Sequence, residues 1–145
     1  MQEARRILVP VDGSENSDKA VVQAVDLAKA CAAVIDLLYV SYFDSGTDDA
    51  VENISWLPDS VTGSTGKTSK AILEHAKTLV PETIERHLHI ETGIPAKKIL
   101  DFAKRNEADM IVIGGRGLGI VEGFLLGSVS QQIIEQAACP VLVVK

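Results

Sequence analysis

Short, almost wholly apolar runs alternate along this sequence with longer segments whose apolar residues recur at helical spacing. The runs at 7–11, 110–113 and 141–144 consist almost entirely of Ile, Leu, Val and Met. A strand that is apolar at nearly every position is expected to be covered on both faces, as in a parallel sheet. Parallel neighbours need crossover connections, which the helical segments can supply. The pattern therefore predicts an open α/β fold, with a mainly parallel sheet sandwiched by helices.

The remaining elements follow from the same two periodicities. Two more strands are predicted, one at 34–42 from its β-branched and aromatic residues and one at 84–90 from its alternation of apolar and polar residues. Helices are predicted at 17–31, 70–79, 95–106 and 128–137. No internal repeat is evident, and 145 residues suit one domain with a proper core. We therefore expect a single five-stranded α/β domain over residues 1–145.

One segment, 43–69, interrupts this rhythm because it is long, polar and rich in Ser, Thr, Gly and Asp. Loops of this length without structure of their own are uncommon, and residues 56–58 could form one short packed turn. A variable surface insertion and a flap over a site both remain open. Residues 63–68 resemble the end of a P-loop, but Val61 stands where the first glycine belongs and no buried strand precedes it. We therefore do not interpret it as a phosphate loop.

Charge and cysteine usage exclude several classes of protein. The net charge of −6 argues against a broad nucleic-acid surface, which needs clustered Lys and Arg. No apolar run approaches the ~20 residues that span a bilayer, so no membrane insertion is expected. The first ten residues do not form a signal peptide. Cys31 and Cys139 form neither a metal-ligand spacing nor a disulfide framework, and both are expected to be small buried residues. A reducing, cytoplasmic location fits best.

The segment after the fourth predicted strand carries the most chemistry. Residues 114–119 read Gly-Gly-Arg-Gly-Leu-Gly, and Gly-Ser-Val-Ser follows at 127–130, where a helix begins. In open α/β sheets, ligands bind outside the carboxyl ends of the strands at the topological switch point. Glycines admit a ligand close to the backbone, and a helix N-terminus offers N–H groups to an anion. Arg116 adds a charged donor suited to phosphate, and Ser128 and Ser130 add hydroxyls.

The same residues also have a purely structural interpretation. The glycines could form a flexible loop, and Ser128 could be a plain N-cap, since Ser128-x-x-Gln131 matches a capping box. A dinucleotide fingerprint is not supported, because Ile120 replaces its third glycine. Asp12 could be a turn-forming residue. It falls, however, at the predicted switch point, where a carboxylate could accept from ribose or adenine or lie beside a divalent ion.

Three segments and one motif carry a resemblance to a known family. The segments are 6–14 (RILVPVDGS), 109–114 (DMIVIG) and 139–144 (CPVLVV). The motif is Gly, two residues, Gly, nine residues, Gly and then Ser or Thr, and it is met by Gly114, Gly117, Gly127 and Ser128. Over essentially its whole length the chain resembles the universal stress protein family, and the motif marks that family's ATP-binding branch. The resemblance implies the strand order 3-2-1-4-5, with a nucleotide between strands one and four.

The resemblance also implies a role for each site residue. Pro10, Val11 and Asp12 should flank the adenosine, and Val40 should offer backbone groups to adenine. The ribose and the phosphates should be held by Gly114, Arg116, Gly117, Gly127, Ser128, Val129 and, as a weaker candidate, Ser130. The implied ligand is ATP or AMP. Mg²⁺ or Mn²⁺ could accompany the phosphates near Asp12.

Two classes of function compete for such a site. One is a binding module whose occupancy by nucleotide changes its interactions in a stress response or in signalling. The other is a slow ATP hydrolase or self-phosphorylating enzyme, which must orient water and stabilise charge at the γ-phosphate. Among the three histidines, His87 and His89 lie on one face of a strand predicted far from the site, and no general base is evident. Binding is therefore favoured, and a nucleotidyl-transfer or flavoprotein-like role on a related fold is the remoter alternative.

The last strand lies at a sheet edge in the implied order. An exposed run of Val-Leu-Val-Val would promote aggregation, and pairing with the same strand of a second copy would cover it. We therefore expect a homodimer through residues 140–145, as the family resemblance also implies. The sequence does not identify a protein partner.

Overall fold

The computed structural model describes residues 5–41, 56, 65–116 and 126–145, with only the backbone of 65–67. The strands are β1 (Arg6–Pro10), β2 (Val34–Ser41), β3 (Arg86–Thr92), β4 (Met110–Gly114) and β5 (Val141–Val144). The helices are α1 (Glu15–Cys31), α2 (Thr65–Thr78), α3 (Pro95–Arg105) and α4 (Ser128–Gln136). The strands form one sheet in the order β3-β2-β1-β4-β5, and every neighbouring pair is parallel. The predicted fold class and the strand order implied by the resemblance are both confirmed.

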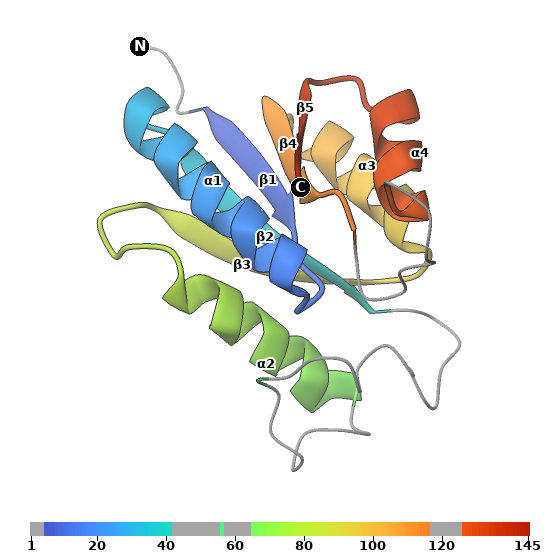
Figure 1. Ribbon diagram of the computed structural model, residues 1–145, viewed down its shortest axis with the longest axis horizontal. Coiled ribbons are helices and arrows are strands. Elements are labelled where there is room, and N and C mark those ends of the chain that lie inside the picture. Colours follow the sequence, from blue (N-terminus) through green and yellow to red (C-terminus); the bar gives the residue numbers. More distant parts are fainter. Residues whose placement is uncertain (1–4, 42–55, 57–64, 117–125) are drawn as a thin grey trace.

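One layer of helices covers each face of the sheet (Figure 1). Helices α1 and α2 pack against the face that carries Val9 and Leu37. Helices α3 and α4 pack against the face that carries Leu8 and Ile111. The consecutive residues Leu8 and Val9 point to opposite faces and are both fully buried. The unbroken apolar composition of β1 therefore has the origin that its sequence predicts, which is burial on both sides.

Three features of the structure correct the sequence analysis. Helix α2 begins at Thr65, inside the segment 43–69 for which a loop is expected. Strand β5 is only partly buried at all four positions, because it forms an edge of the sheet. Cys31 is exposed, since it closes α1 beyond the helix's last buried residue, Ala28. Cys139 lies beyond the end of α4 and is also not fully buried.

Candidate functional site

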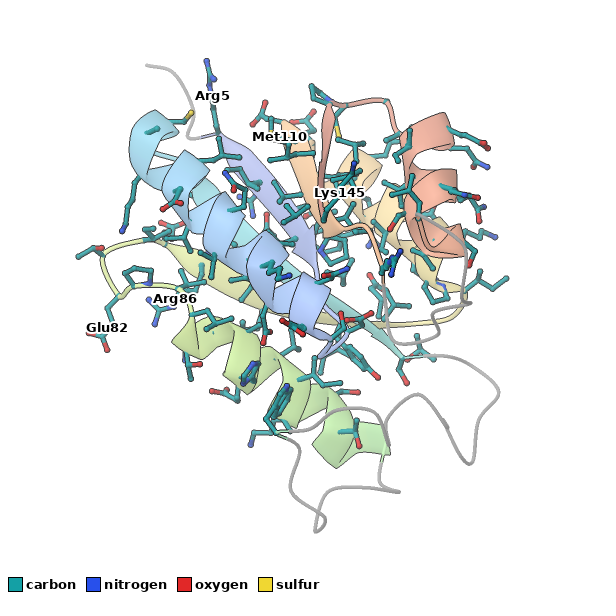
Figure 2. The ribbon with its side chains drawn as sticks, viewed as in Figure 1. Arg5, Glu82, Arg86, Met110 and Lys145 are labelled. Carbon is teal, nitrogen blue, oxygen red and sulfur yellow. The ribbon has the colours of Figure 1, made fainter. Side chains whose placement is uncertain are left out.

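The candidate site lies where the connections from β1 and β4 diverge. Helix α1 follows β1 on one face of the sheet, and α4 follows β4 towards the other (Figure 1). Because β1 and β4 are neighbours, their carboxyl ends form the topological switch point. Figure 2 labels Arg5 and Met110, which mark the amino ends of the same two strands and thus the opposite end of the sheet. The site is therefore built from the residues that follow Pro10, which is buried, and Gly114.

The turn after β1 is held by a dense set of hydrogen bonds. Val11 N–H donates to the Leu38 carbonyl of β2 at 2.9 Å. Asp12 N–H donates to Ser17 Oγ at 3.2 Å, and Asp12 Oδ1 accepts from Ser14 N–H at 2.9 Å. The interpretation of Asp12 as a turn-forming residue is therefore confirmed. No hydrogen bond from the described residues reaches its other oxygen, Oδ2.

Helix α1 begins on this turn and is capped by it. Ser14 is the N-cap, and its Oγ accepts from Ser17 N–H at 3.1 Å while its carbonyl accepts from Asp18 N–H. Gly13 has a φ of 87°, a left-handed conformation that strains residues with a side chain. Glu15 and Asp18 place negative charge in the first turn, where it complements the helix dipole. The Ser14 side chain therefore caps α1, and acidic residues of the protein itself complement the positive end of its dipole.

Gly114, the last residue of β4, lies against that first turn. A Cβ on Gly114 would lie 2.8 Å from the backbone carbonyl carbon and oxygen of Asn16, closer than a side-chain carbon can approach. The Gly114 carbonyl accepts from Ser130 Oγ of α4 at 2.8 Å. Gly114 is therefore the point at which the first turns of α1 and α4 both meet the sheet. Packing alone requires a glycine here, whatever its role toward a ligand.

Helix α4 begins without a side-chain cap. Its N-cap is Gly127, whose N–H donates to the Gly115 carbonyl at 2.7 Å. Ser128 is the first helical residue and is exposed, so the interpretation of Ser128 as the N-cap of a capping box is wrong. Because Gly127 has no side chain, no cap from that position satisfies the first N–H groups of α4.

The next two residues of α4 face inward. Val129 is half-buried and packs against the core on the α3/α4 side. Ser130 is buried, and its hydroxyl proton is used by the Gly114 carbonyl, so Ser130 Oγ cannot also donate to a phosphate. Ser130 thus joins α4 to the end of β4, while Ser128 is the hydroxyl that solvent and ligands can reach.

The other predicted residues lie around this centre. Val40 is half-buried near the carboxyl end of β2, one strand beyond β1. Arg116 is exposed two residues after β4 and makes no ion pair within the described part of the chain. Gly117 lies outside the described residues, as do 42–55 and 57–64. The structure thus brings the Asp12 turn, Gly114 and the start of α4 together.

The sequence did not identify Trp56, His75 and Asp18 as a connected group beside the Asp12 turn. The Trp56 indole Nε1 donates to the Gly13 carbonyl at 3.1 Å. The indole stacks on the His75 ring of α2, with centroids 4.0 Å apart and planes 7° apart. His75 Nε2 lies 2.9 Å from Asp18 Oδ2 of α1. The signal in the sequence is a single tryptophan inside a polar segment, which indicates an anchored residue without identifying its partner.

The sequence also did not identify a charged cluster of Asp36, Arg6 and His89 on the α3/α4 face of the sheet. Asp36 of β2 is 1% exposed and accepts from the Arg6 guanidinium at 2.8 and 3.0 Å. His89 Nε2 lies 2.9 Å from Asp36 Oδ1, and its ring packs on Phe102 of α3. A buried carboxylate needs such partners, because an unpaired one is strongly destabilising. His89, for which a surface position is expected from the sequence, is instead half-buried as a partner of a buried carboxylate, whereas His87 is exposed.

The sequence as a whole matches one family model. Residues 3–145 match the model of the universal stress protein family. The chain belongs to this family. Universal stress protein YxiE of Bacillus subtilis is 34% identical over 145 residues, which cover 97% of this chain and 98% of YxiE. The family resemblance carried by the glycine motif and the three strand segments is thereby confirmed.

Solved structures share the fold of this universal stress protein. One from Archaeoglobus fulgidus, in complex with dAMP, matches it with a TM-score of 0.70 at 21% identity, with 100% of both chains covered. Another universal stress protein, in complex with cAMP, matches with a TM-score of 0.66 at 24% identity, covering 99% of this chain and 98% of its own. Within the described residues, no helix is long and apolar enough to cross a membrane.

Proposed function

We propose that this universal stress protein binds an adenine nucleotide, ATP or AMP, at the carboxyl ends of β1 and β4. We further propose that occupancy of this site regulates its interactions in a stress response or in signalling. The observation that carries the proposal is the uncapped start of α4, joined through Gly114 to the Asp12 turn. Free N–H groups at a helix start attract anions, and a switch point is where such ligands bind. The dAMP and cAMP complexes of proteins with this fold support an adenosine ligand.

Each part of the ligand would meet a different element. The backbone N–H groups of 128–130 and the Ser128 hydroxyl would hold phosphate, with the exposed Arg116 guanidinium adding charge. Val11 and Val40, at the ends of β1 and β2, would border the adenosine. Asp12 Oδ2 would accept from a ribose hydroxyl or coordinate a cation. Gly117 keeps its predicted role beside the phosphates.

A divalent cation, Mg²⁺ or Mn²⁺, would fit this site only together with the phosphates. The described residues hold no cluster of three His, Cys, Asp or Glu side chains that could bind a metal. One carboxylate oxygen, Asp12 Oδ2, accepts no hydrogen bond from the part of the chain that the structure describes. Mg²⁺ is commonly held by one or two carboxylates and by the substrate's phosphates, which agrees with this arrangement.

Binding is proposed in preference to turnover. Hydrolysis needs a group that orients water at the γ-phosphate. Among the described residues, His75 contacts Trp56 and Asp18 rather than Asp12 itself, and one of its ring nitrogens is engaged by Asp18. His89 lies against Asp36, on the α3/α4 face of the sheet. Neither histidine is therefore placed as a general base.

Calorimetric titration with ATP, AMP and GTP tests the proposal. We expect adenine nucleotides to bind. Gly127→Val should lower their affinity, since a branched side chain would then lie at the start of α4. Thr83→Val, at an exposed position in the connection before β3, is the matched control. Phosphate release is expected to stay at background. The proposal is wrong if no adenine nucleotide binds.

We also propose that β5 pairs with the same strand of a second copy. Strand β5 is a sheet edge, and its four residues Val141–Val144 are all only partly buried. An apolar edge of this kind is normally covered, and an antiparallel pair about a two-fold axis would cover both copies. Sedimentation at micromolar concentration should show a species of twice 15.5 kDa. A 15.5 kDa species throughout would contradict the dimer.

A further inference from the structure

A single peptide unit links Trp56 to Asp12. The peptide between Gly13 and Ser14 presents its carbonyl to the Trp56 indole Nε1–H at 3.1 Å and its N–H to Asp12 Oδ1 at 2.9 Å. The described residues contain no cis peptide bond, so the carbonyl and the N–H of this unit point in opposite directions. The indole and the carboxylate therefore hold the same rigid plane from its two ends. Rotation of this plane would break both hydrogen bonds at once.

The Trp56 indole is positioned by His75 and, through it, by Asp18. Trp56 stacks face to face on His75, and His75 Nε2 is bonded to Asp18 Oδ2 at 2.9 Å. A carboxylate oxygen accepts, so this contact is a hydrogen bond in the tautomer that carries the N–H at Nε2. Asp18 belongs to the first turn of α1, the helix that begins on the Asp12 turn. The contacts thus form a closed ring that runs from α1 through α2 and Trp56 back to the turn.

Glycine at position 13 makes this support necessary. Its φ of 87° lies in the left-handed region, which glycine enters as readily as other conformations. The backbone alone therefore does not fix the plane between Gly13 and Ser14. A donor on its carbonyl also polarises the peptide and strengthens the hydrogen bond that its N–H makes.

We propose that Trp56 is a positioning residue of the nucleotide site. Through the peptide between Gly13 and Ser14, Trp56 fixes Asp12 Oδ1 in the turn and so presents Oδ2 to the ribose or the cation of an adenine nucleotide. The identity of the ligand in this inference rests on the proposed function. The coupling between Trp56 and the turn rests only on the described contacts.

A double-mutant cycle with AMP tests the coupling. Trp56→Phe keeps a stacking ring and removes the donor. We therefore expect it to raise the Kd for AMP about fivefold, which corresponds to the loss of one neutral hydrogen bond. Asp12→Ala should weaken AMP at least as much. If Trp56 acts through Asp12, the double variant binds no more weakly than Asp12→Ala alone. Glu74→Gln, exposed on α2, is the matched control and should bind like the unsubstituted protein.

A second measurement needs no ligand. Hydrogen exchange of the Ser14 amide, followed by NMR in the nucleotide-free protein, should be several-fold faster in Trp56→Phe and unchanged in Glu74→Gln. Unaltered AMP affinity in Trp56→Phe, or effects of the two substitutions that simply add, would overturn the nucleotide role. If the unsubstituted protein binds no adenine nucleotide, the proposed function fails. The Ser14 exchange rate then decides separately whether Trp56 positions the turn, and an unchanged rate overturns that too.

Discussion

The two helices that start at the switch point start in opposite ways. Helix α1 is preceded by Asp12 and Ser14, whose side chains accept from backbone N–H groups of the turn and of the helix. Helix α4 is preceded by Gly127, which has no side chain to cap it. The two starts meet at Gly114, which packs against Asn16 of α1 and accepts from α4. Both helix starts are positive ends of a dipole, yet only α1 is neutralised by its own acidic residues.

The difference separates scaffold from site. A capped helix start contributes its hydrogen bonds to folding, whereas an uncapped start keeps them for an incoming anion. We therefore expect removal of the Ser14 cap of α1 to lower stability and substitutions at the start of α4 to lower affinity, whereas Asp12, in the turn before α1, belongs to the proposed site. Three predictions compare the surroundings of the two helices, beginning at Gly114, where both meet the sheet.

The largest loss of stability is expected for Gly114→Ala. The new Cβ would lie 2.8 Å from the Asn16 backbone, which cannot move without shifting α1, and overpacking of this kind costs roughly 1–3 kcal/mol. Gly115→Ala is the matched control, since its Cβ would meet side-chain carbons of Val143 and Leu126 at 3.2 and 3.3 Å. Neither glycine has a positive φ, so the comparison isolates packing. Urea denaturation measures both free energies of unfolding, and equal losses would contradict this account.

A smaller and more specific contrast is expected between Ser14→Ala and Ser128→Ala. Ser14→Ala removes the cap of α1 and should lower the free energy of unfolding by about 1 kcal/mol. Ser128→Ala alters an exposed residue that caps nothing, so stability should be nearly unchanged while AMP affinity falls. Denaturation and calorimetry on both variants measure the two effects. Similar destabilisation by the two substitutions would remove the distinction between the two helix starts.

The smallest effect is expected for the reactivity of the two cysteines, which lie at the carboxyl end of α1 and just after that of α4. Cys31 ends α1 and is exposed, whereas Cys139 follows α4 and burial raises the pKa of its thiol, with the Asp109 carboxylate adding to the rise. A raised pKa leaves less thiolate at neutral pH, so iodoacetamide should modify Cys31 several-fold faster. The ratio should narrow as the pH rises, because more of Cys139 then ionises. Mass spectrometry follows both sites, and unfolded protein, which should show equal rates, is the control.

Much of the sheet could be predicted from the sequence. Strands β1 and β4 were placed within one residue, because a strand buried among neighbours must be apolar at every position. Strand β5 was also placed correctly from its apolar run, although it forms an edge and is only partly buried. Strand β3 begins two residues later than its alternation predicts, and Ile84 is buried in the connection that precedes it. The start of α2 was missed because the residues from Thr65 to Ser69 show no apolar periodicity.

The site was predictable only where it adjoins the strands. The Asp12 turn and the helix start after Gly127 follow directly from the strand and helix pattern. The contact between Trp56 and Gly13 joins residues 43 positions apart, and it depends on the tertiary placement of His75 of α2 beside Asp18 of α1. Asp36 was likewise hidden in an apolar strand, since its pairing with Arg6 depends on the register of β1 and β2.

The strand order has a consequence for synthesis on the ribosome. Strand β1 leaves the ribosome before the other four strands, yet it occupies the centre of the sheet, and one of its edges stays unpaired until residues 110–114 emerge. Until they emerge, the nascent chain carries a buried-type strand with one unpaired edge and only the Asp12 half of the proposed pocket. A ligand that bridges both halves can be held only after residues 127–130 have been translated. Nucleotide occupancy would therefore also distinguish chains that have been translated past the start of α4 from shorter ones.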